Sequence, residues 1–213
     1  MSELIVDSFV MGPYGSNCYV IRAERAASDA AVVDPGDDPT PLRLELARMG
    51  TRAAGILVTH TDIDHIGGVA ALAEGTGAEV WAPAGEVDAL VTGETRGGMR
   101  VAPHEPAHTV TGGDQIDVAG IVFDVVDVPG HSSGHVAFHH GGHLFSGDLL
   151  FADSVGRVDL PGGDWATLLD SVRALRDRFP EDTVVHPGHG PATTLGRELR
   201  ANPFLRDHRA ETQ

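Results

Sequence analysis

Four short polar clusters in this 213-residue chain bring together residue types that bind metal ions. The first, at residues 60–65, contains two histidines and two aspartates. The others are Pro-Gly-His at 129–131, Ser-Gly-Asp at 146–148 and Pro-Gly-His at 187–189. Imidazole and carboxylate groups gathered in one place suit zinc, manganese or iron. The clusters therefore predict a metal site built from segments far apart in the sequence.

Each cluster directly follows a stretch that is typical of a β-strand, and these stretches are residues 55–58, 123–128, 143–145 and 183–185. Ligands and catalytic groups in α/β folds are held in loops at strand ends, because the rigid sheet aims the loop side chains. We therefore expect the four clusters to meet at one edge of a sheet.

Alternating strand-like and helix-like segments run along the whole chain, which shows no linker, repeat or block of charge. Strands are predicted at residues 4–10, 17–22, 30–33, 54–59, 79–82, 115–118, 121–128, 135–139, 143–146 and 183–185. Helices are predicted at residues 41–50, 68–74, 86–91, 164–180 and 195–200, with Asp164 as the N-cap of the fourth and a loop over most of 85–108. This order favours one layered α/β sandwich spanning residues 1–213.

The clusters resemble the motif of the metallo-β-lactamase superfamily, which is His-x-His-x-Asp-His followed by a distant His, an Asp and a last His. Residues 146–151, 156–163 and 187–194 are similar to the short glyoxalase II-like hydrolases, which act as hydroxyacylglutathione hydrolases. The resemblance implies an αββα sandwich that binds two divalent metal ions per chain, zinc, iron or manganese. It implies that the first metal is held by His60, Asp62 and His131, that the second is held by Asp64, His65 and His189, and that Asp148 bridges the two.

One position departs from that motif, since its second histidine is Asp62 in this chain. A carboxylate is a harder donor than imidazole and carries a negative charge, so it favours manganese or iron over zinc. We expect this residue to influence which metal is used.

The resemblance implies a thioesterase that cleaves a small acyl thiol by attack of a metal-bound hydroxide, which Asp64 would orient. A thiol has a pKa near ~8.5, so its thiolate leaves without a strong general acid. Arg157 is the candidate to bind an anionic group of the substrate, and its alternative is an ion pair with Asp153 or Asp159.

Four other functions stay open at this point. They are hydrolysis of a lactone or another small ester, an iron-dependent oxidoreductase of the persulfide dioxygenase or di-iron kind, an inactive binding module, and a serine hydrolase. The last would use Ser132 in the Gly-x-Ser-x-Gly sequence at 130–134. That motif must lead into a helix, whereas the residues that follow alternate as in a strand.

The composition excludes several other classes of function. The net charge is −16, all 15 basic residues are arginine, and none of the 213 residues is lysine. Binding to nucleic acid or to an anionic membrane is therefore disfavoured, and the lysine of a P-loop is missing. The single Cys18 excludes an internal disulfide and a cysteine-ligated cluster. No apolar stretch approaches a membrane span, and the start lacks the pattern of a signal peptide, so we expect a cytoplasmic protein.

Overall fold

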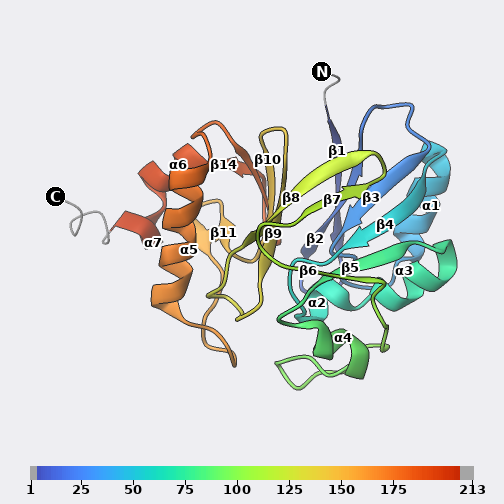
Figure 1. The fold of residues 1–213 in the computed structure, drawn as a ribbon, viewed down its shortest axis with the longest axis horizontal. Coiled ribbons are helices and arrows are strands. Elements are labelled where there is room, and N and C mark those ends of the chain that lie inside the picture. The colour runs from blue at the N-terminus through green and yellow to red at the C-terminus, as the bar shows by residue number, and fades with distance from the viewer. Residues whose placement is uncertain (1–3, 207–213) are drawn as a thin grey trace.

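The computed structural model, which describes residues 4–206, contains two six-stranded sheets that pack face to face (Figure 1). The first sheet has the order β1-β2-β3-β4-β5-β6. Its strands are β1 (Ile5–Met11), β2 (Ser16–Arg22), β3 (Asp29–Val33), β4 (Arg52–Leu57), β5 (Glu79–Pro83) and β6 (His108–Val110). Strands β3 to β6 are parallel to one another, while β1, β2 and β3 pair antiparallel.

The second sheet has the order β14-β13-β10-β9-β8-β7. Its strands are β7 (Gln115–Val118), β8 (Ile121–Asp127), β9 (Val136–His140), β10 (His143–Gly147), β13 (Val184–Pro187) and β14 (Thr193–Thr194). Only the β10–β13 pair is parallel. A small hairpin, β11 (Leu150–Phe151) and β12 (Ser154–Val155), follows β10.

Helices cover the outer face of each sheet. Helices α1 (Thr40–Met49) and α3 (Val69–Thr76) pack on the first sheet, and α5 (Trp165–Arg178) and α6 (Leu195–Ala201) pack on the second (Figure 1). The short helices are α2 (Ile63–Ile66), α4 (Val87–Thr92) and α7 (Pro203–Arg206). Together the helices and sheets form the αββα sandwich that the sequence predicts.

Three apolar cores separate the four layers, and strand β2 shows how the sequence builds them. All seven of its residues are buried, because successive side chains point to opposite faces. Cys18 and Val20 pack against the α1 and α3 layer, whereas Tyr19 and Ile21 pack between the sheets. The third core lies between the second sheet and α5, where Leu168, Leu169, Val172 and Leu175 are buried.

The predicted elements are all present, with ends that differ by a few residues. Asp164 caps α5 as expected, since its carboxylate accepts a hydrogen bond from the backbone N–H of Thr167 at 2.8 Å. Helix α1 ends at Gly50, which adopts φ 66° in the left-handed region that glycine favours. Strands β6, β11, β12 and β14 and helices α2 and α7 are additional, and each has four residues or fewer, too few for a periodic pattern.

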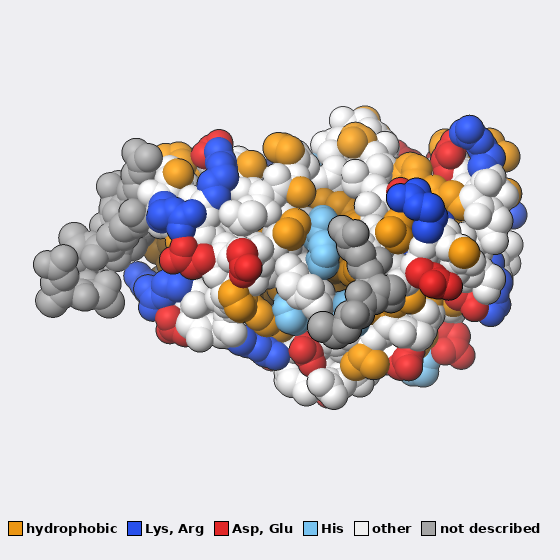
Figure 2. All heavy atoms as spheres, turned by 90° about the horizontal axis from the view of Figure 1, so that it is seen from above, with side chains coloured by type: hydrophobic (Ala, Val, Ile, Leu, Met, Phe, Trp, Pro, Cys, Tyr) orange, Lys and Arg blue, Asp and Glu red, His pale blue; other side chains and the backbone are white. Residues whose placement is uncertain are grey.

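The surface has no arginine-rich stripe on the face drawn in Figure 2, where basic side chains are scattered among acidic ones. Between residues 4 and 206, no helix has the length and apolar character needed to cross a bilayer.

Candidate metal centre

The predicted ligands converge at the end of the sandwich where β4, β8, β10 and β13 finish. His60 follows β4, and α2 begins two residues later with Asp62 as its N-cap. His131 lies after β8, Asp148 after β10 and His189 after β13. The four clusters therefore lie together, but strands from both sheets carry them, and not the edge of a single sheet.

A buried carboxylate, Asp34, orients two of the histidines. Its Oδ2 lies 3.0 Å from Nδ1 of His65 and accepts a 2.6 Å hydrogen bond from the Thr59 hydroxyl. Because the Thr59 proton is used in that bond, Nδ1 of His60, 3.0 Å away, donates to the Thr59 oxygen. Both imidazoles thus carry the hydrogen on Nδ1 and direct the lone pair of Nε2 into the site.

His131 is oriented in the same way by the backbone. Its Nδ1 lies 2.8 Å from the carbonyl oxygen of Arg157 and donates to it, so its Nε2 also faces the site as an acceptor. Three histidines, two from residues 60–65 and one from residues 129–131, are therefore oriented with Nε2 toward the site.

Two groups of possible ligands lie side by side. Asp64, His65 and His189 form one group, and His60, His131 and Asp148 form the other. In the first group, His189 Nε2 is 3.1 Å and His65 Nε2 is 3.8 Å from Asp64 Oδ2. Two ligands bound to one ion at ~2.0–2.1 Å in a tetrahedron lie roughly 3.4 Å apart. The spacing fits a metal ion.

Asp148 faces both groups. Its Oδ1 is 3.3 Å from His65 Nε2, and its Oδ2 is 3.5 Å from His189 Nε2 and 3.8 Å from His131 Nε2. This position is the one expected of a bridging ligand.

Three buried ligand atoms lack a hydrogen-bond partner within residues 4–206, which tests whether the site fits a metal. They are His60 Nε2, His65 Nε2 and Asp148 Oδ1. A buried polar atom without a partner costs roughly 1–3 kcal/mol, so native proteins avoid it unless something else binds there. His65 Nε2 and Asp148 Oδ1, 3.3 Å apart, fit a divalent cation held together with Asp64 and His189, whereas His60 Nε2 belongs to the other group of possible ligands.

Protons partly take the place of that cation in the metal-free site. Hydrogen bonds to Asp148 and Asp64 raise the pKa of His189 to about 9, against the effect of burial. Burial would lower the pKa of His65, but the carboxylates of Asp148 and Asp34 raise it well above its usual range. Burial and the neighbouring histidines lower the pKa of His60, which stays neutral.

Asp62 points toward His60 and His131, as the sequence predicts, but it has an additional partner. Its Oδ2 lies 3.9 Å from His60 Nε2 and 3.1 Å from His131 Nε2. Arg96 binds both of its oxygens, with Nε 2.5 Å from Oδ1 and a terminal nitrogen 2.6 Å from Oδ2. Burial opposes ionisation, but Arg96 and His131 hold the pKa of Asp62 far below its usual range.

The loop that carries His189 is tied to the first sheet. The Asn17 side chain donates to the carbonyls of Pro187 and Gly190 at 3.0 and 2.8 Å, and the Tyr19 hydroxyl donates to Pro187 at 2.7 Å. Gly188 leaves room for the ligands, because a Cβ there would lie 2.0 Å from Asp148 Oδ1.

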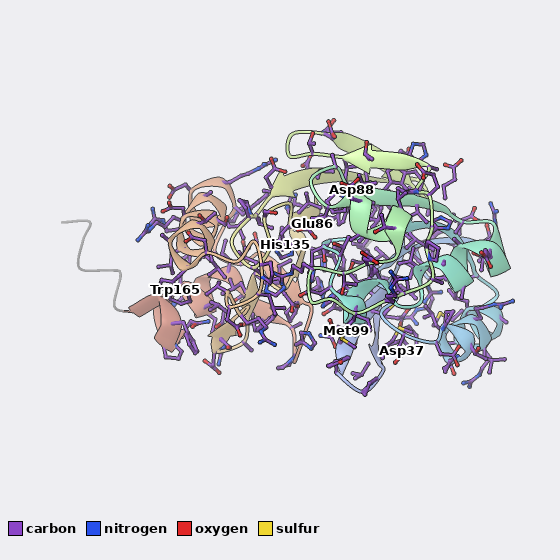
Figure 3. The ribbon with its side chains drawn as sticks, turned by 90° about the horizontal axis from the view of Figure 1, so that it is seen from below. Asp37, Glu86, Asp88, Met99, His135 and Trp165 are labelled. Carbon is purple, nitrogen blue, oxygen red and sulfur yellow. The ribbon has the colours of Figure 1, made fainter. Side chains whose placement is uncertain are left out.

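A cavity of about 340 Å³ opens onto both groups of ligands. Five of the predicted ligands line it, and they are Asp62, Asp64, His131, Asp148 and His189. The other lining residues are Tyr14, Ile63, Thr95, Gly97, Met99, Arg157 and Leu160. Its size, near the lower end of ligand pockets, suits a small molecule. Figure 3 views this end of the protein, with Glu86 and His135 where the two halves meet.

Arg157 lines the cavity, as expected of a residue that binds a substrate anion. It also forms the ion pair with Asp159 that was predicted as the alternative. Its guanidinium forms two 2.7 Å hydrogen bonds with the carboxylate of Asp159, and the side chains are 60% and 65% exposed. The pair stays accessible to solvent and to a ligand in the cavity.

Ser132 has a structural partner. Its hydroxyl donates to Glu86 Oε1, which also accepts from the backbone N–H of Gly134, while Glu86 Oε2 accepts twice from Thr61. The residues after Ser132 enter strand β9, not the helix that a nucleophilic serine requires.

Residues 11–189 match the sequence profile of the metallo-beta-lactamase superfamily. The chain belongs to this superfamily. A superfamily relative, the hydroxyacylglutathione hydrolase GloC of Haemophilus influenzae, is 30% identical, and the match covers 90% of this chain and 93% of GloC.

Two solved structures of the superfamily share the fold. The B3 metallo-beta-lactamase BLEG-1 superposes with a TM-score of 0.85 and 33% identity, over 94% of this chain and 99% of BLEG-1. TTHA1623 in a di-iron-bound form superposes with a TM-score of 0.83 and 39% identity, over 94% of this chain and all of TTHA1623. The four-layer fold of this superfamily member is thereby confirmed.

Four further residues shape the site although their sequence context indicated no such role: Asp34, Thr59, Glu86 and Arg96. Asp34 belongs to an Asp-Pro-Gly turn and has φ 51°, a left-handed conformation that aspartate tolerates. The turn was visible in the sequence, but its carboxylate gave no sign of pairing with His65. Arg96 lies in an irregular loop and gave no signal.

Proposed function

We propose that the protein is a metal-dependent thioesterase that hydrolyses a small acyl thiol. The observation that carries the proposal is the group formed by Asp64, His65, His189 and Asp148, of which Asp64, His189 and Asp148 line a 340 Å³ cavity and His65 lies buried behind them. The hydroxyacylglutathione hydrolase GloC, with 30% identity over nearly its whole length, supports a thioester as the substrate class.

These four side chains would hold a divalent cation. When bound, such a cation polarises the substrate carbonyl and acidifies water. Zinc, manganese and iron all accept a set of two imidazoles and two carboxylates. Asp34 contributes by holding His65 in the tautomer that presents Nε2 to the site.

Asp64 is the residue we assign to orienting the attacking water. Its carboxylate lies at the cavity surface, 3.1 Å from His189 Nε2, and 17% of its side chain is exposed, against 11% for Asp148, the other carboxylate of the group. An ionised carboxylate accepts the hydrogen bond of a water and fixes its approach to the carbonyl carbon. The C–S bond breaks to release a thiolate, which needs no proton from the protein.

Assays of thiol release test the proposal. The purified protein is stripped with a chelator, reloaded separately with zinc, manganese and iron, and given a hydroxyacyl thioester of glutathione, an acyl-coenzyme A and a lactone. We expect thiol release only from metal-loaded protein and loss of most turnover in Asp64→Asn, with the exposed Asp117→Asn as control. If the protein hydrolyses the lactone and neither thioester, its substrate is a cyclic ester and the thioesterase proposal is wrong.

An iron-dependent oxidoreductase is the second candidate, favoured by the 39% identity with di-iron-bound TTHA1623 and by the extra carboxylate of Asp62. The two candidates differ in what they consume. Oxygen uptake by the iron-loaded protein with a thiol persulfide, without thiol release from any thioester, would select this second function.

A further inference from the structure

The side chain of Arg96 is placed where a first metal ion would have to bind. One terminal nitrogen of Arg96 donates to Asp62 Oδ2 and also lies 2.8 Å from His131 Nε2. Without Arg96, the lone pair of that Nε2 would face a metal. Asp62 and His131 are two of the three residues expected to hold that metal. Because Asp62 Oδ2 and His131 Nε2 already accept hydrogen bonds from Arg96, the guanidinium and a metal compete for the same atoms.

The guanidinium makes all the hydrogen bonds that it can donate. Nε and one terminal nitrogen bind Asp62, the same nitrogen reaches His131 Nε2, and the other terminal nitrogen donates to the carbonyls of His131 and Pro161 at 2.5 and 3.4 Å. Arginine has five N–H donors in a fixed fork, and these contacts use all five. Arg96 thereby links the loops of Asp62, His131 and Pro161, and a first metal would otherwise link the first two of them.

The loop that carries Arg96 is itself well defined. Helix α4 ends at Gly93, and the backbone of Thr95 then pairs with Met99 at 2.9 Å and that of Val101 with Gly93 at 3.0 Å. Thr95 is buried, and only 12% of the Arg96 side chain is exposed. A partly buried bidentate pair in a fixed loop is stronger than an exposed ion pair.

Charge balance leads to the same arrangement. Arg96 neutralises Asp62, which leaves Asp64 and Asp148 as the carboxylates of the group that face histidines and no arginine among the described residues. One divalent cation neutralises those two charges. A second divalent cation would need Asp62 as a ligand and would force the guanidinium away from a carboxylate that it binds with two hydrogen bonds.

We infer that the Arg96 guanidinium replaces the first metal ion, and that this chain binds one divalent cation, at Asp64, His65, His189 and Asp148. Arg96 is a positioning residue here, since it fixes Asp62 and His131 beside the cavity. The inference rests on the metal-binding part of the proposed function and departs from the two-metal arrangement that the motif implies.

Counting bound manganese tests the inference without any assay of activity. The metal-free protein is titrated with Mn²⁺, bound metal is measured by elemental analysis after desalting, and electron paramagnetic resonance distinguishes a single ion from a coupled pair. The wild type is expected to bind one equivalent with the spectrum of an isolated ion. Two equivalents with a coupled spectrum in the wild type would overturn the inference, and no binding would overturn both it and the proposed function.

Variants then identify the residue responsible. Arg96→Met frees Asp62 and His131, so we expect it to raise the affinity for a second equivalent by at least ~10-fold, the effect that residues supporting metal ligands have. The double variant Asp62→His with Arg96→Met should bind two equivalents as a coupled pair. Arg100→Met, an exposed arginine of the same loop that pairs with Glu94, is the matched control and should bind one.

The outcomes separate the inference from the proposed function. One equivalent in the wild type together with no thioester hydrolysis supports the inference and contradicts the function. Two equivalents in the wild type together with thioester hydrolysis would contradict the inference and support the proposed function. A second site that fails to appear in folded Arg96→Met, judged by circular dichroism, would show that Arg96 does not exclude the metal.

Discussion

The carboxylate of Asp34 lies 3.0 Å from Nδ1 of His65, and both side chains are almost completely buried. This contact fixes the tautomer and the orientation of a ligand that has no other support on that nitrogen. The same carboxylate reaches His60 through Thr59. One residue outside the motif therefore orients two of its histidines.

Asp34→Asn is expected to weaken metal binding by roughly 10- to 100-fold, as the loss of an oriented partner of a ligating histidine does. The amide keeps the shape but accepts less strongly, and one of its ends presents N–H groups to Thr59 or His65. Competition with a fluorescent chelator measures the affinity. The exposed Asp117→Asn is the control, and an unchanged affinity in folded Asp34→Asn would contradict the role given to Asp34.

Metal affinity is expected to rise with pH between about 6.5 and 9. The pKa of His189 in the metal-free protein is raised to about 9, and that of His65 lies well above its usual range, so a metal must displace one or two protons. Each displaced proton strengthens apparent binding about 10-fold per pH unit. Calorimetry in two buffers of different ionisation enthalpy counts the protons, and a count near zero at pH 7.5 would contradict the assignment.

The raised pKa of His189 also predicts how the stability of the metal-free protein depends on pH. A histidine with a folded pKa above its unfolded value of ~6.5 stabilises the metal-free protein fully below pH 6.5 and loses that contribution as pH rises through about 9. Metal-free protein should therefore unfold at progressively lower temperature over this range. The metal-loaded form should not, since bound metal replaces the proton. Thermal melts with and without chelator at each pH measure the difference.

Gly188→Ala is expected to damage the metal centre. The added Cβ would lie 2.0 Å from Asp148 Oδ1 and 2.7 Å from His65 Cε1, so the ligands must move, at a cost of roughly 1–3 kcal/mol. Lower metal content and a lower melting temperature should result. Gly97→Ala is the control, because the nearest atom to its Cβ would be 3.9 Å away. Equal metal content in both variants would show that the ligands adjust without loss.

Ser132→Ala is expected to retain most of the thioesterase activity. The serine hydroxyl donates to the carboxylate of Glu86, so its loss removes one hydrogen bond, worth roughly 1.5–3 kcal/mol, from the contact between two loops. The measurement combines thiol release with a melting curve. Complete loss of turnover in a folded variant would restore the serine hydrolase as an alternative.

The sequence predicted those parts of the site that follow strands and missed those that depend on loop geometry. His60, His131, Asp148 and His189 come directly after recognisable strands, and the sheets bring strand ends together. Arg96 lies 34 residues from Asp62 in a loop with no periodic pattern, so no local signal indicated their ion pair. The same limit explains why Asp62 was predicted as a metal ligand without its partner.

Arg157 provides the last prediction, which concerns the substrate. Its guanidinium borders the cavity and is paired with the exposed carboxylate of Asp159. The Arg157 side chain is 60% exposed, so a ligand in the cavity can reach it. An anionic group of the substrate would compete with Asp159 for the same N–H donors. Arg157→Gln should therefore raise KM for a carboxylated thioester and leave kcat nearly unchanged, since the lost contact would be with the carboxylate of the substrate and not with its thioester group.

The solvent exposure of Arg157 limits how much KM can change. A solvent-exposed ion pair contributes at most about 1 kcal/mol, so the change in KM should be roughly 2- to 5-fold. Asp159→Asn should lower KM, because it removes the competing carboxylate, and neither change should affect a neutral thioester. Arg173→Gln, at an exposed arginine paired with Asp170 on α5, is the control. Equal KM values for wild type and Arg157→Gln with the carboxylated substrate would show that the anion binds elsewhere in the cavity.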